Sequence, residues 1–173
     1  MKDELINILD LENKKEFESA FNSYENLYLQ NKNDFEIWKH FYFFLWIVIE
    51  NMSNEFVEKI SREKKLKEMF NEGKLIFSEK AEFNFIVGYT MSIFPYEFGD
   101  YDEFEKLSFQ LITKAKNLEP TNPIYKMVYL NNVDSEKSNY ENARKEATSK
   151  VLETYKGTGL LNDYFGQVLY RIN

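Results

Sequence analysis

Apolar positions recur at three- and four-residue steps along most of this chain, which is the spacing that places side chains on one face of an α-helix. The pattern is clearest over residues 103–118. Its small and apolar face consists of Phe104, Leu107, Ser108, Leu111, Ile112, Ala115 and Leu118. Gly99 and Asp100 suit a tight turn and an N-cap before it, and Pro120 and Pro123 end it and open the next helix. The stretch therefore predicts a helix with clear boundaries at both ends.

The same spacing predicts helices along the rest of the chain. They are expected over residues 3–11, 13–30, 35–50, 53–73, 78–94, 123–131, 135–155 and 158–172. Helix starts are expected at Asp34, Ser53 or Asn54, Ser78, Asp134 or Ser135, and Thr158. No low-complexity linker interrupts the series. We therefore expect one all-α domain over residues 1–173, a compact right-handed solenoid of seven or eight antiparallel helices.

The helix over residues 35–50 is apolar nearly all the way round, which is typical of a buried central helix or of a membrane span. Its longest apolar run, residues 41–49, is about half of what a membrane span needs. We therefore expect a core helix in which Trp38, Phe41, Leu45 and Ile49 are buried.

Charge and composition narrow the class of protein. The net charge of −7 argues against direct nucleic-acid binding, because phosphate contacts need a basic surface. The chain has no cysteine, so disulfides and thiolate zinc sites are excluded. The first twelve residues are charged and helical in pattern, unlike a signal peptide. We therefore expect a soluble, cytoplasmic protein that does not bind a membrane.

Few residues suit catalysis or metal binding. His40 is the only histidine, which removes most triad, general-base and metal-ligand schemes, and we expect it to be packed and hydrogen-bonded. Asp100 and Asp102 begin like a calcium loop, but Phe104 and Leu111 occupy positions that need ligands. We therefore expect no catalysis, no cofactor and no metal. An enzyme that uses carboxylates alone is a distant third alternative.

One segment combines features of a protein-binding surface. Residues 94–105 alternate aromatic side chains, which give rigid contact area, with acids, which steer a basic partner. The candidate partner-binding residues are Tyr96, Glu97, Phe98, Asp100, Tyr101, Asp102, Glu103 and Glu105. In the alternative interpretation the aromatics cover the core of their own hairpin, while the acids are solvated and favour the start of a helix.

The chain also carries signs of an internal repeat. Leu29-x-x-x-Asn33-x-Phe35 is echoed by Leu118-x-x-x-Asn122-x-Ile124, 89 residues further on. Half of that offset is about 44 residues, a length typical of helical-hairpin repeats, and would put a third junction near residues 73–78.

Within this series, three motifs resemble the tetratricopeptide repeat pattern. They are Gly88, the turn Gly99-Asp100-Tyr101-Asp102-Glu103, and the run Ala115-x-x-Leu118-x-Pro120-x-Asn122. Each arm is four residues longer than the family's spacing, about one helical turn, and Asn84 stands where the family has an aromatic residue. The resemblance covers roughly residues 79–125. It implies an α-solenoid of degenerate repeats and no catalysis.

In size, acidity and repeat character the chain is also similar to immunity proteins of bacterial contact-dependent or polymorphic toxin systems. That resemblance implies direct binding to a cognate toxin, often a basic nuclease, whose active site or substrate surface is covered. The alternative is a tetratricopeptide-like adaptor or chaperone that holds a peptide or helix in a concave groove.

Overall fold

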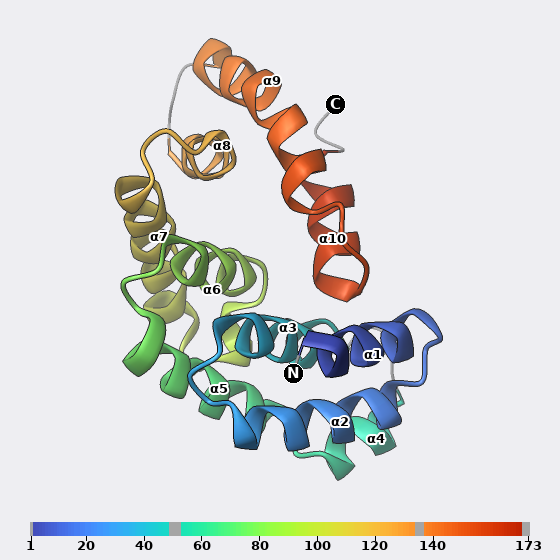
Figure 1. Ribbon diagram of the computed structural model, residues 1–173. Coiled ribbons are helices and arrows are strands. Elements are labelled where there is room, and N and C mark those ends of the chain that lie inside the picture. Colours follow the sequence, from blue (N-terminus) through green and yellow to red (C-terminus); the bar gives the residue numbers. More distant parts are fainter. Residues whose placement is uncertain (1, 49–52, 134–136, 171–173) are drawn as a thin grey trace. The chain divides into compact units, whose positions relative to one another are not determined.

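The computed structural model describes residues 2–48, 53–133 and 137–170, and these residues form an all-helical structure without a β-strand (Figure 1). The helices are α1 (Lys2–Asn13), α2 (Phe17–Gln30), α3 (Phe35–Ile47), α4 (Asn54–Lys59), α5 (Arg62–Phe77), α6 (Ala81–Ile93), the 3₁₀-helix η2 (Pro95–Glu97), α7 (Tyr101–Leu118), α8 (Pro123–Asn131), α9 (Lys137–Thr154) and α10 (Leu160–Val168). The predicted all-α class is confirmed. The described part of the chain forms ten α-helices in place of the expected seven or eight.

The chain divides into two compact units, each described here by itself. Unit 1 contains the described residues up to Ile76 together with Gly157–Tyr164. Unit 2 contains those from Phe77 to Lys156 together with the residues from Phe165 onward. The division falls inside α5 and α10, so these two helices contribute residues to both units. The single domain over residues 1–173 stays a prediction.

The core of unit 1 is built around α3. Asp34 caps this helix, as predicted, because its carboxylate accepts the backbone N–H groups of Glu36 and Ile37 at 2.9 and 3.1 Å. Trp38, Phe41 and Leu45 are buried, as predicted, whereas Ile49 lies outside the described residues. α3 is therefore a core helix of unit 1, as its apolar circumference predicts, because neighbouring residues cover it on several sides.

The predicted helix over 53–73 is wrong in two respects. Ser53 caps a short helix, α4, and the chain then turns at Ser61, which has a φ of 48°. Arg62 begins α5 and is itself buried, where Nε and Nη2 donate to the carbonyl groups of Leu45 and Trp46 at 2.6 and 3.1 Å. The break between α4 and α5 thus places the guanidinium of Arg62 beside the carbonyl groups at the C-terminal end of α3. These groups have no partner within their own helix and need hydrogen-bond donors.

Gly73 does not stop α5, which continues to Phe77. A Cβ atom at this position would lie 2.5 Å from Cε2 and Cζ2 of Trp38. The glycine is therefore explained by close packing against the indole and not by the end of a helix.

Three other helices start later than predicted. Their first residues are Phe17, Ala81 and Leu160, in place of Asn13, Ser78 and Thr158. Lys15 and Gly159, with φ of 60° and 96°, turn the chain before the first and the last of these. The predicted cap at Asp134 or Ser135 lies outside the described residues.

Helix junctions recur at regular intervals. The N–H groups of Asp34, Lys80 and Asn122 each donate to the carbonyl group three residues earlier, at 2.9 to 3.0 Å. All three residues have an extended backbone and precede a helix. The third junction thus lies at Lys80, slightly beyond the predicted residues 73–78, and the interval stays in the forties.

Within the described ranges, no helix combines the length with the apolar character that crossing a bilayer requires.

Candidate partner-binding site

The candidate site lies where α6 turns through η2 into α7, in unit 2. Pro95 opens η2, and Asp100 caps α7 by accepting the N–H of Glu103 at 3.1 Å. A Cβ at Gly99 would lie 2.6 Å from the ring of Phe104, so the turn has room only for glycine. The predicted turn and cap are therefore present, and α7 starts two residues earlier than expected.

The eight predicted residues do not all reach the surface. Tyr96 and Tyr101 are 59% and 52% exposed. Glu97 and Phe98 are only 8% and 5% exposed, and the ring of Phe98 lies 6.0 Å from that of Phe104. The alternative interpretation, in which aromatics cover the hairpin's own core, therefore describes Phe98.

The remaining residues form one exposed set, which we call the acidic tip. It consists of Tyr96, Asp100, Tyr101, Asp102, Glu103 and Glu105. Asp102 and Glu103 occupy the first turn of α7, where the helix dipole favours negative charge. The hydroxyl of Tyr101 donates to Glu105 at 3.4 Å, which holds an aromatic ring beside a carboxylate. The acidic tip thus presents aromatic area and negative charge together.

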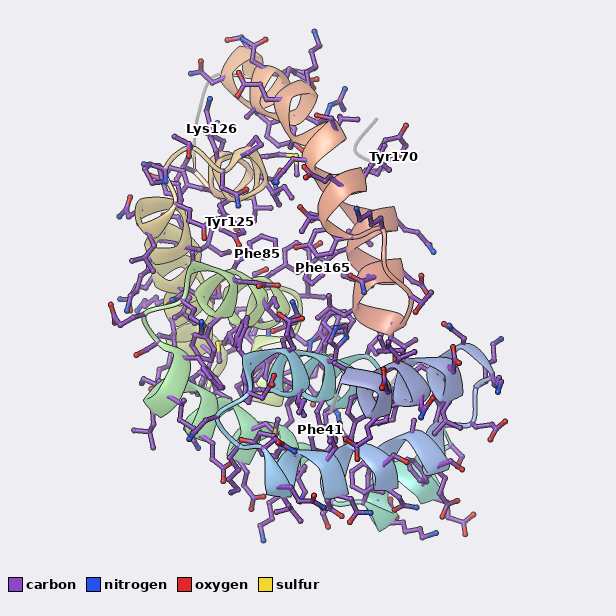
Figure 2. All side chains as sticks on the ribbon, in the orientation of Figure 1. Phe41, Phe85, Tyr125, Lys126, Phe165 and Tyr170 are labelled. Carbon is purple, nitrogen blue, oxygen red and sulfur yellow. The ribbon has the colours of Figure 1, made fainter. Side chains whose placement is uncertain are left out.

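A second feature of unit 2 is an aromatic cluster between α6 and α8. The ring of Phe165 is fully buried and lies 5.1 to 5.5 Å from those of Phe85, Tyr89 and Tyr155. Phe85 in turn contacts Tyr125 of α8 at 4.8 Å, and Figure 2 shows Phe85, Tyr125 and Phe165 close together. Burial raises the pKa of the Tyr155 hydroxyl well above its ordinary value.

A cavity of about 250 Å³ lies in the same unit. It is lined by Tyr89, Ser92, Ile93, Met127, Val128, Asn131, Asn132, Tyr140 and Leu169. The groove between α6 and α8 therefore holds the side chain of Phe165 and remains open beside Leu169. Phe165 falls in the helix expected over residues 158–172, but nothing in the sequence indicates which helices it contacts.

Among the buried titratable groups of unit 1 are an acid, Glu12, and an imidazole, His40. Glu12 accepts the Tyr24 hydroxyl at 2.8 Å and the N–H of Leu160 at 2.9 Å, and burial raises its pKa to about 7. His40 is packed as predicted, and its Nδ1 has no hydrogen-bond partner, so the expected hydrogen bond is not made at this nitrogen. Burial, with a smaller contribution from Lys39, lowers the pKa of His40 to about 3. Sequence reasoning missed Glu12, because only its burial distinguishes it from other acids.

Across the described residues, no group of three or more histidine or acidic side chains is placed to hold a metal ion. No protein-family model matches this chain, and no curated protein or solved structure is significantly similar to it.

Proposed function

We propose that this protein binds another protein without catalysing a reaction, and that its partner is basic. The observation that carries this proposal is the acidic tip, where two exposed tyrosines stand among four exposed acids. Exposed aromatic residues supply contact energy at protein interfaces, and clustered acids accelerate encounters with a basic surface. The net charge of −7 adds to the same attraction.

We further propose that the helices form degenerate tetratricopeptide-like hairpins. Gly88 of α6 supports this, because a Cβ there would lie 3.0 Å from the carbonyl oxygen of Ser108 and from the backbone nitrogen of Ile112. Glycine therefore lets α6 approach the backbone of α7, as expected for a tight helical hairpin. The fully buried Ala115 and the recurring junctions at intervals in the forties support the same arrangement.

The most specific form of the proposal is an immunity protein that neutralises a cognate, nuclease-type toxin by direct binding. A nuclease that binds a polyanion needs a basic surface, and the acidic tip would compete for that surface. The partner to test is therefore the product of the neighbouring gene, which this proposal expects to be a basic toxin.

The experiment reverses charge at the tip and keeps the residue that caps α7. Asp102, Glu103 and Glu105 are changed together to lysine, and Asp100 is left intact because it caps α7. A matched variant reverses three exposed acids elsewhere, Asp10→Lys, Glu58→Lys and Glu68→Lys, so that both variants have the same net charge.

Association with the toxin is followed by stopped flow at two ionic strengths, and nuclease inhibition is measured in parallel. We expect the tip variant to associate roughly tenfold more slowly than the matched variant, with weaker salt dependence. Equal association rates for the two folded variants would contradict the role of the tip, and absence of binding by the wild-type protein would contradict the immunity function.

The groove between α6 and α8 supports a second candidate, an adaptor that holds a partner helix. Phe165 of α10 and Leu169, which follows α10, already lie there, so the groove accepts apolar side chains from a helix end. In that case Met127→Ala, which alters the cavity beside Leu169, should weaken partner binding, and reversing the tip charges should not. The two candidates therefore predict opposite outcomes for the same pair of variants.

A further inference from the structure

Unit 1 contains a pocket between α1 and α3 that the proposed function does not use. Its volume is about 370 Å³, within the range of roughly 300–1,000 Å³ typical of small-molecule sites. Leu5, Ile6 and Leu9 line it from α1, and Ile37 and His40 line it from α3. Asp34 and Glu36 complete the lining. Most of this wall is aliphatic, so burial of an apolar ligand would be favourable.

The polar side chains of the pocket differ in whether they already take part in a hydrogen bond or an ion pair. Asp34 caps α3, and Glu36 forms an ion pair with Lys39 at 2.9 Å. His40 is only 6% exposed, and its Nδ1 is buried without a hydrogen-bond partner. Because Nδ1 has almost no accessible surface, a ligand in the pocket can reach the imidazole only at the rest of its ring edge. With Asp34 and Glu36 already engaged, the imidazole is the remaining polar side chain of this wall.

The charge state of His40 and of its neighbours restricts the ligand. Because burial and Lys39 hold the pKa of His40 at about 3, the imidazole is neutral at ordinary pH and offers one donor and one acceptor. A hydroxyl group can donate or accept, so it suits either ring nitrogen and either tautomer. The carboxylates of Asp34 and Glu36 disfavour an anion, because like charges repel.

We propose that this pocket binds a free small molecule that is neutral and apolar and carries one hydroxyl group, of the size of a single-ring phenol. The apolar body packs against Leu5, Ile6, Leu9 and Ile37. The hydroxyl group makes a hydrogen bond to the imidazole of His40.

The test uses the full-length protein with two probes, p-cresol and toluene, which differ by the hydroxyl group. His40 is the only histidine, so a ¹⁵N-histidine label gives one imidazole spectrum that needs no assignment. We expect p-cresol to bind saturably and to shift the imidazole nitrogens, and toluene to leave them nearly unchanged. The ratio of the toluene Kd to the p-cresol Kd should be about fivefold larger for the wild type than for His40→Leu, the effect of one neutral hydrogen bond.

A second pair of variants tests the pocket without touching its buried wall. Ile6 lies at the rim and is about half exposed, so Ile6→Trp should block entry while the protein still folds. Ile93→Trp, at a similarly exposed isoleucine in unit 2, is the control and should bind p-cresol as the wild type does. The proposal is overturned if p-cresol fails to saturate, if the imidazole signals do not respond, if His40→Leu leaves the ratio unchanged, or if Ile6→Trp binds normally.

Discussion

Replacing Gly73 with alanine tests a tightly packed contact in unit 1. The new Cβ would lie 2.5 to 2.6 Å from Cε2, Cζ2 and Nε1 of Trp38, closer than non-bonded atoms approach. The indole cannot move aside freely, because Nε1 donates to the carbonyl group of Met69 at 2.9 Å. It is also stacked against Phe35 and Tyr42, at centroid distances of 5.8 and 4.9 Å.

The magnitude follows from three contributions. Overpacking a core by one methyl group costs about 1–3 kcal/mol, and weakening the buried hydrogen bond of Trp38 costs about 1 kcal/mol. Alanine recovers about 1 kcal/mol over glycine inside a helix. We therefore expect Gly73→Ala to lower the free energy of unfolding by about 1–3 kcal/mol, although the substitution favours a helix.

Gly166→Ala is the matched control. Gly166 also lies inside a helix, but a Cβ there would meet the backbone oxygen of Tyr155 at an ordinary 3.6 Å. This variant should gain up to about 1 kcal/mol from helix propensity. Urea unfolding followed by circular dichroism measures both, and Trp fluorescence reports separately on unit 1, which contains both tryptophans. If Gly73→Ala stabilises the protein as much as Gly166→Ala does, the tight packing of Trp38 is refuted.

Three further predictions concern unit 1. Leu45→Ala removes a fully buried side chain from α3 and should cost about 2–5 kcal/mol in urea unfolding; a cost below 1 kcal/mol would contradict the core assignment. Arg62→Met removes the hydrogen bonds from the guanidinium to the carbonyl groups of Leu45 and Trp46 and should cost about 2–4 kcal/mol, which thermal unfolding can measure. The raised pKa of Glu12 means that the folded state binds an extra proton between pH 4.5 and about 7, so stability should fall by about 3 kcal/mol as the pH rises through that window and level off above it. Glu12→Gln should remove this dependence, and an unchanged pH profile in that variant would show that another group causes it.

The helices could be predicted from the sequence wherever the cause was local. Asp34, Ser53 and Asp100 were recognised as caps because a short polar side chain followed by an apolar helical pattern is enough to begin a helix. The break at Ser61 escaped prediction, because the buried contacts of Arg62 with α3 accompany it and those are tertiary. The expected helix end at residue 73 is wrong for the same reason, since only the position of Trp38 explains the glycine there.

The candidate site could be predicted in part. Alternating aromatics and acids located the turn between α6 and α7, and the exposed Tyr96 and Tyr101 lie there. The sequence could not indicate that Glu97 and Phe98 turn inward, because the geometry of η2 decides the direction of each side chain. The pocket beside His40 could not be predicted either, since it depends on how α1 lies against α3.

The hydrogen bond between Glu12 and Leu160 has a consequence for how the protein is made. It joins residues 148 positions apart. During synthesis, α1 and α2 therefore leave the ribosome long before the segment that contains Leu160 has been made. Closing so large a loop costs entropy and slows folding, and until residues 157–164 emerge, unit 1 lacks the buried Leu161. Neither unit is a continuous stretch of chain. A single proteolytic cut between Phe77 and Lys156 therefore leaves no fragment that contains all of unit 1.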